Sequence, residues 1–196
     1  SITVTGFKMH PTGLSKCIEE TAKAIQWGQK SPASAPNKRR GKGTAIMWKA
    51  PAMPPNAGSS AWVELAEDGT VNVGLGGQDL GQGAFTVMAQ MAAAALGVPY
   101  ESVRISSPVD TRYSPYEWQT VASRLTWSMG NAVVNAARDA RRQVLDLVSE
   151  AWDEDPENLD IRDGVVVSYK SEQEQPLKNL VIYGLPKPDD QGWMGG

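Results

Sequence analysis

The sequence predicts an α+β fold in which β-hairpins and a mixed sheet pack against two or three helices. The turn dipeptides Asp68-Gly69 and Asp163-Gly164 each separate two short segments that are typical of strands, which indicates two hairpins. Longer segments over 84–96 and 123–152 have the character of helices. This mixture of hairpins and helices favours an α+β fold over a doubly wound parallel sheet.

The first predicted element is a helix over 14–27, which Gly28 ends. One apolar stripe at helical spacing identifies it, and we expect its only cysteine to be a small buried residue. The stripe consists of Leu14, Cys17, Ile18, Ala22 and Ile25. A loop rich in Ser, Pro, Lys, Arg and Gly is predicted over 29–43, and a strand over 44–50.

A hairpin comes next, followed by a helix. The strands 61–65 and 70–75 form the hairpin, and a glycine-rich turn at 76–83 leads into the helix 84–96. Gly97 and Pro99 end that helix, since neither residue continues a helix well. A short strand is predicted over 103–105.

The second half of the chain begins with an irregular loop over 108–120. A long helix over 123–152 follows, with an apolar stripe that comprises Val133, Ala137, Ala140, Val144 and Val148. A second hairpin pairs 159–162 with 165–169, and a short helix is predicted over 177–183. We therefore predict one domain over 1–185 and a loose C-terminal tail over 186–196.

Composition excludes several classes of function. The 196 residues carry a formal net charge of −3, which argues against nucleic acid or an anionic membrane as the main partner, because both attract clustered positive charge. We expect the basic run Lys38-Arg39-Arg40 with Lys42 to be solvated. The single cysteine rules out an intrachain disulfide and fits a reducing, cytoplasmic location. No apolar run approaches the roughly 18 residues of a membrane span.

The glycine-rich turn at 76–83 is the most informative segment. Glycines let a ligand approach the backbone, and the N–H groups ahead of a helix favour an anion such as phosphate. Gln82 could pair its amide with a planar heterocycle. The segment matches neither a P-loop nor a Rossmann fingerprint. On spacing alone, a turn that only lets the strand and the helix pack closely is the favoured alternative.

A second polar segment begins the long helix. Thr120 and Ser123 could cap the helix or offer hydroxyls to a phosphate, and Arg124 could supply a bidentate fork for the same anion. An ordinary helix cap beside a surface arginine is the alternative. Two such helix starts together indicate an extended ligand that carries phosphates and a polar ring system.

Six separated motifs occur in an order that resembles the xanthine dehydrogenase and aldehyde oxidase family, specifically the second molybdenum-cofactor-binding domain of its large subunit. They are Asp68-Gly69-Thr70-Val71, Gly77-Gln78-Asp79-Leu80-Gly81-Gln82-Gly83, Leu96-Gly97-Val98-Pro99, Asp110-Thr111, Ala122-Ser123-Arg124 and Gly130-Asn131-Ala132-Val133. The resemblance implies that the chain binds molybdopterin. The implied contacts with the pterin and its phosphates are Leu80, Gly81, Gln82, Gly83, Ala122, Ser123, Arg124 and Thr126.

The resemblance also implies a cytosine dinucleotide form of molybdopterin, with the molybdenum held by the pterin dithiolene rather than by protein ligands. It further implies a parent enzyme that oxidises an aldehyde or an N-heteroaromatic compound with water as the oxygen source. Iron–sulfur centres and FAD would lie on other domains or subunits. The partners would therefore be the remaining domains of the large subunit, the iron–sulfur and flavin subunits, and a small-molecule substrate.

Two family segments have no match in this chain. We find neither an upstream Gly-Gly-x-Phe-Gly turn nor a downstream Gly-x-Gly-Glu segment with the catalytic base. The glutamates in helix-end and loop contexts are interpreted as solvated charges; they are Glu150, Glu154, Glu157, Glu172 and Glu174. We therefore expect a fragment of a larger subunit with no catalytic residue and no turnover of its own. A non-catalytic assembly or binding module that kept the scaffold, and a stand-alone nucleotide-binding domain, are the alternatives.

Overall fold

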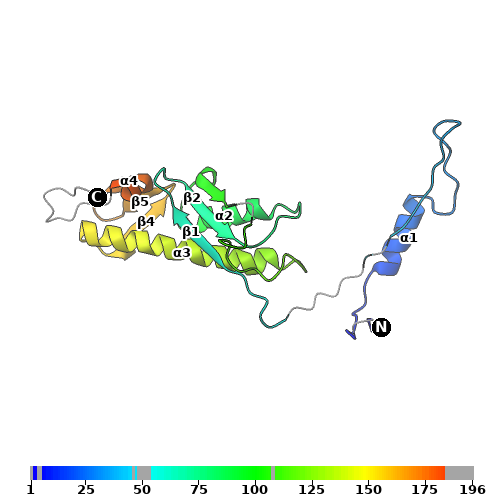
Figure 1. Cartoon of the computed structure of the whole chain (residues 1–196), viewed down its shortest axis with the longest axis horizontal. Coiled ribbons are helices and arrows are strands. Elements are labelled where there is room, and N and C mark those ends of the chain that lie inside the picture. Colours follow the sequence, from blue (N-terminus) through cyan, green and yellow to red (C-terminus); the bar gives the residue numbers. More distant parts are fainter. Residues whose placement is uncertain (1, 4–5, 46, 48–53, 107–108, 184–196) are drawn as a thin grey trace. The chain divides into compact units, whose positions relative to one another are not determined.

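The computed structural model describes residues 2–3, 6–45, 47, 54–106 and 109–183. The chain forms two compact units, unit 1 over Ser1–Ala52 and unit 2 over Met53–Gly196. Unit 1 contains helix α1, and unit 2 contains all the other labelled elements (Figure 1). The single domain over 1–185 stays a prediction, and the predicted tail over 186–196 lies outside the described residues.

Helix α1 (Leu14–Ala24) is shorter than predicted, and none of its residues is buried. Cys17 is exposed, so the expectation of a small core residue was wrong. An amphipathic stripe becomes a core only where a second apolar face covers it. Of the predicted strand 44–50, residues 44, 45 and 47 have no strand structure, and the others lie outside the described residues.

The first sheet of unit 2 is mixed, as predicted. Strand β1 (Ala61–Leu65) pairs antiparallel with β2 (Val71–Leu75) across the turn at Asp68-Gly69. Strand β3 (Val103–Ile105) pairs parallel with β2, because helix α2 (Ala84–Leu96) carries the chain back between them. The α2 and β3 segments match the predicted ranges.

The second sheet is antiparallel and contains one strand that was not predicted. Strands β4 (Leu159–Arg162) and β5 (Val165–Ser168) form the second hairpin. Strand β6 (Glu174–Pro176) adds to β5 and leads directly into helix α4 (Leu177–Tyr183). A polar three-residue strand that ends in proline has no pattern from which it could be recognised.

Helix α3 (Leu125–Trp152) runs along unit 2 from the end near α2 to the β4–β5 end (Figure 1). It packs on α2 so closely that a Cβ at Gly130 would lie 2.7 Å from the sulfur of Met91. The core joins this helix pair to both sheets and includes the fully buried Val73, Met88 and Val133. The α+β prediction is confirmed. No helix among the described residues is long and apolar enough to cross a membrane.

One of the five glutamates interpreted as solvated lies in the core. Glu154 is only 8% exposed, so that interpretation was wrong for this residue. Its carboxylate accepts hydrogen bonds from the hydroxyls of Ser168 (2.7 and 2.8 Å) and Ser171 (3.0 Å). Ser168 is the last residue of β5 and Ser171 follows it, so the buried carboxylate fixes the end of β5 against the C-terminus of α3.

Candidate functional site: a pocket between two loops

The glycine loop (residues 76–83) connects β2 to α2, and its two halves differ. A Cβ at Gly76 would lie 2.3 Å from the Pro115 carbonyl oxygen, and one at Gly77 would lie 2.7 Å from Leu125. These glycines therefore permit close packing. Gly81 and Gly83 have φ of +105° and +79°, and a Cβ there would meet no atom within 4 Å. The packing interpretation of the turn thus holds for Gly76 and Gly77, and ligand binding at Gly81 and Gly83 stays a prediction.

The N-terminus of α2 is closed by an anion of the chain itself. The Asp79 carboxylate accepts hydrogen bonds from the backbone amides of Gly81 (2.7 Å), Gly83 (3.3 Å) and Phe85 (3.3 Å). These bonds, the one from Gly81 above all, lower the pKa of Asp79. A ligand phosphate would have to compete with this carboxylate, so the prediction that the amides of this helix start receive an anion does not fit the structure.

Gln82 folds back over the glycine loop. Its Oε1 accepts a hydrogen bond from the Leu80 amide (2.6 Å), and its Nε2 donates to the Gln78 carbonyl (3.3 Å). The residue is exposed, and Leu80 beside it is 72% exposed. The amide is thus held at the surface of the loop, where a heterocycle could exchange with one of these bonds.

The corner (residues 119–124) precedes α3 and has an unusual backbone. Ala122 and Ser123 have φ of +54° and +57°, a left-handed conformation that costs residues other than glycine about 1–2 kcal/mol each. Consecutive strained residues are typical of functional sites. Arg124 is the N-cap residue of α3, and its own side chain makes no capping hydrogen bond; within the described part of the chain, the predicted caps Thr120 and Ser123 do not cap this helix either.

Thr120 joins the two loops instead. Its hydroxyl accepts a hydrogen bond from the Gln78 amide at 2.8 Å, across 42 residues of sequence. This bond connects the middle of the glycine loop to the corner. The two predicted segments therefore meet in the fold, at the same end of the α2–α3 pair.

Arg124 is buried, with 3% of its surface exposed. One terminal nitrogen pairs with the Glu117 carboxylate and donates to the Gln119 carbonyl, and the other donates to the carbonyls of Ala57 and Gly58. The hydroxyls of Ser59 and Ser128 also lie within hydrogen-bonding distance. The predicted fork for a phosphate is thus occupied by groups of the protein.

A cavity of about 450 Å³ opens between the two loops; we call it the two-loop pocket. Six of the eight predicted site residues line it, and Gly81 and Gly83 flank them in sequence. The lining consists of Leu80, Gln82, Ala84, Val87, Thr120, Val121, Ala122, Ser123, Arg124, Leu125 and Thr126. Apolar side chains, exposed hydroxyls, an amide and the uncapped start of α3 suit a flat heterocycle with a phosphate tail. The residues present therefore fit such a group.

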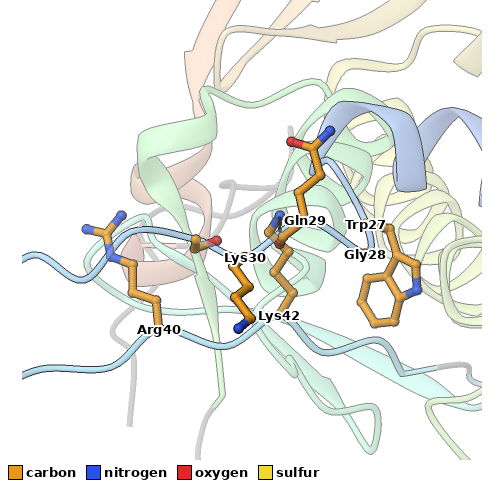
Figure 2. A pocket seen from close by; sticks show the side chains of 7 residues that line it. Trp27, Gly28, Gln29, Lys30, Arg40 and Lys42 are labelled. Atoms are coloured by element: carbon orange, nitrogen blue, oxygen red, sulfur yellow. Dashed lines mark hydrogen bonds between the residues drawn. The ribbon is translucent and has the colours of Figure 1, made fainter.

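Unit 1 has a pocket of its own, of about 310 Å³, lined by Trp27, Lys30, Arg40 and Lys42 among others (Figure 2). The Lys42 ammonium donates to the carbonyls of Gln26 (2.6 Å) and Gln29 (3.1 Å). This contact ties the following loop to the C-terminal end of α1, where carbonyl oxygens favour a cation. None of the predicted site residues lies in this pocket.

Comparison with known proteins now decides the family. The family model of the molybdopterin cofactor-binding domain matches residues 19–187. The chain belongs to this molybdopterin-binding family. The putative xanthine dehydrogenase molybdenum-binding subunit XdhA of Escherichia coli K12 is 30% identical over 205 residues, which cover 96% of this chain and 26% of that protein.

Two further relatives agree with this assignment. The large subunit of nicotine 6-hydroxylase from Paenarthrobacter nicotinovorans is 30% identical over 105 residues, 54% of this chain and 13% of that one. The structure of quinoline 2-oxidoreductase from Pseudomonas putida 86 matches with a TM-score of 0.57 and 29% identity, over 63% of this chain and 16% of that one. The resemblance to the xanthine dehydrogenase family is confirmed. The chain spans about a quarter or less of the length of these relatives.

Three residues of the molybdopterin-binding domain have roles that sequence reasoning missed: Asp79, Glu117 and Thr120. Asp79 had a usable signal, because an aspartate two residues before a glycine often bonds to that backbone amide. Glu117 and Thr120 had none, since each acts on a segment that only the fold brings near.

Proposed function

We propose that the two-loop pocket is where this molybdopterin-binding domain contacts its cofactor. The observation that carries the proposal is the convergence of two segments, predicted separately from sequence, on one cavity. The chain's own contribution is to bind and orient the cofactor, which supplies the redox chemistry when bound.

The two walls of the pocket suit different parts of the cofactor. Leu80, Gly81, Gln82 and Gly83 form an exposed backbone shelf for the flat pterin ring, with the Gln82 amide available to its polar edge. Ala122, Ser123 and Thr126 surround the start of α3, where free amides and hydroxyls favour phosphate. A pyrophosphate at this point would fit the cytosine dinucleotide form.

At the level of the whole protein, we propose the large subunit of a molybdenum hydroxylase. Its reaction would be oxidation of an aldehyde or an N-heteroaromatic compound with water as the oxygen source. The remaining domains of the subunit would complete the pocket and supply the catalytic base, and iron–sulfur and flavin subunits would receive the electrons. We expect the cytoplasm as its location and no turnover by this chain alone.

Pterin content tests the binding proposal. The chain is produced in cells that make molybdopterin, and the bound pterin is measured by fluorescence after oxidation. We expect Gln82→Ala and Ser123→Ala to lower pterin per chain by about 10-fold, the effect of one or two lost hydrogen bonds to charged or polar groups. Gln143→Ala, on the exposed face of α3, is the matched control and should leave it unchanged.

Two outcomes would redirect the proposal. Unchanged pterin content in both pocket variants would mean that the pterin binds outside the two-loop pocket, and absence of pterin from the unmodified chain would favour the assembly or binding module that kept only the scaffold. Pterin without cytidine monophosphate after hydrolysis would exclude the dinucleotide form while leaving the pocket assignment intact.

A further inference from the structure

We propose that Arg124 is a positioning residue: with Glu117 it clamps the corner into the shape that receives phosphate, and it does not bind the phosphate itself. That the corner binds the phosphate of the cofactor rests on the proposed function. The clamp is a property of the chain without ligand and can be tested separately.

The clamp joins two segments that are distant in sequence, 57–59 and 117–124. Arg124 holds the 57–59 segment through the carbonyls of Ala57 (2.9 Å) and Gly58 (3.2 Å). Glu117 holds the same segment, since its Oε2 accepts from the Ser59 hydroxyl at 2.6 Å. Arg124 and Glu117 then pair with each other, with 2% and 4% of their side chains exposed. Such a buried pair fixes the relative positions of whatever it connects.

The corner needs this support because its backbone is strained. Ala122 and Ser123 are both left-handed, and they lie directly before Arg124. Left-handed residues other than glycine persist only where the surroundings over-determine them. Here the Thr120–Gln78 bond fixes one side of the strained pair, and the Arg124 clamp fixes the other.

Electrostatics also argue against direct phosphate binding by Arg124. Its charge is neutralised by the Glu117 carboxylate and covered by the Trp118 ring, whose centroid lies 5.8 Å from the guanidinium carbon. To reach a phosphate, the guanidinium would have to leave a buried carboxylate unpaired, which is strongly unfavourable. The anion is therefore left to backbone amides and to the hydroxyls of Ser123 and Thr126.

Amide hydrogen exchange of the full chain without ligand tests the clamp. The variants are Glu117→Gln and Arg124→Lys; a lysine ammonium cannot make the planar, two-nitrogen contacts of the guanidinium. In both variants, the backbone amides of Trp118, Gln119 and residue 124 should exchange about 10-fold faster. The middle of α3 should keep its protection. Arg142→Lys, in an exposed pair on α3, is the control. Unchanged exchange at the corner, or equal loss throughout unit 2, would overturn the clamp.

Pterin retention then separates the two roles of Arg124. If Arg124 bound phosphate directly, Glu117→Gln would release the guanidinium and raise the pterin retained per chain. If Arg124 is a clamp, Glu117→Gln and Arg124→Lys should lower it together, by about the same factor. A rise in Glu117→Gln would overturn the proposal. If the unmodified chain retains no pterin, the proposed function fails for this chain, and hydrogen exchange still decides the clamp.

Discussion

Helices α2 and α3 both begin at the two-loop pocket, and they differ in whether a side chain accepts hydrogen bonds from their first backbone amides. The start of α2 is satisfied from within, because Asp79 accepts hydrogen bonds from three backbone amides. The start of α3 has no side-chain cap from the described residues, although Thr120 and Ser123 are near enough in sequence to serve. One helix start is thus closed by the chain's own anion, and the other is open.

Under the proposed function, this difference would place the two ends of the cofactor. A closed, glycine-rich shelf suits the flat and uncharged part, and an open helix start suits the anionic part. It also shows where the stabilising interactions lie. The exposed half of the glycine loop is held mainly by short local hydrogen bonds, and Gln78 adds one long-range bond to Thr120, whereas the corner is held by a buried ion pair that reaches across the sequence to 57–59.

The largest expected effect comes from removing the cation of that pair. Arg124→Met leaves Glu117 buried without its partner, which should lower the free energy of unfolding by about 3–5 kcal/mol. Arg142→Met breaks an exposed pair on α3 and should cost less than ~1 kcal/mol. Urea unfolding monitored by circular dichroism measures both.

A further variant keeps this comparison informative if Arg124→Met does not fold. The double change Glu117→Gln with Arg124→Met removes the unpaired charge and should recover part of the lost stability. Equal stabilities of Arg124→Met and Arg142→Met would mean that the corner is no better anchored than an ordinary surface helix start.

The next largest loss of stability is expected in the packed half of the glycine loop. Gly76→Ala places a Cβ 2.3 Å from the Pro115 carbonyl, and backbone cannot move away cheaply, so we expect a loss of about 1–3 kcal/mol in the free energy of unfolding. Gly58→Ala is the control, because its Cβ would meet no atom closer than 4.0 Å and should change stability by less than ~0.5 kcal/mol. A tolerated Gly76→Ala would show that the glycine loop does not pack tightly on the 115–117 segment.

The sequence predicted the elements that carry their own signals. Helix α2 ends where Gly97 adopts φ of +88°, a position that a glycine directly after an apolar run indicates. The start of α3 was placed two residues too early, because Ser123 has a cap residue's chemistry but a left-handed backbone.

Long-range partners were beyond the sequence. Arg124 was assigned to a phosphate because nothing in the chain shows that Glu117 will lie against it. Cys17 was assigned to a core because an amphipathic stripe does not show whether anything covers it. Glu154 was assigned to solvent because its serine partners lie 14 and 17 residues away, beyond a hairpin. Each of these three errors concerned what surrounds a residue rather than its local structure.

The smallest expected loss of stability comes from removing the Asp79 charge at the start of α2, and this loss should depend on pH. Asp79→Asn removes the charge that three amides stabilise, and it should lower the Tm at pH 7 by about 2–4 °C, as loss of a helix cap does in a chain of this size. Because the pKa of Asp79 is lowered in the folded state, its stabilisation is complete above the unfolded pKa of about 4 and is lost as the pH falls through the folded value. The Tm difference between the two proteins should therefore shrink from pH 5 to pH 2.

Glu67→Gln, an exposed residue with the same change in charge, is the control. A Tm difference that stays constant with pH would mean that the carboxylate charge does not close α2, and the contrast between the two helix starts would then be one of geometry alone.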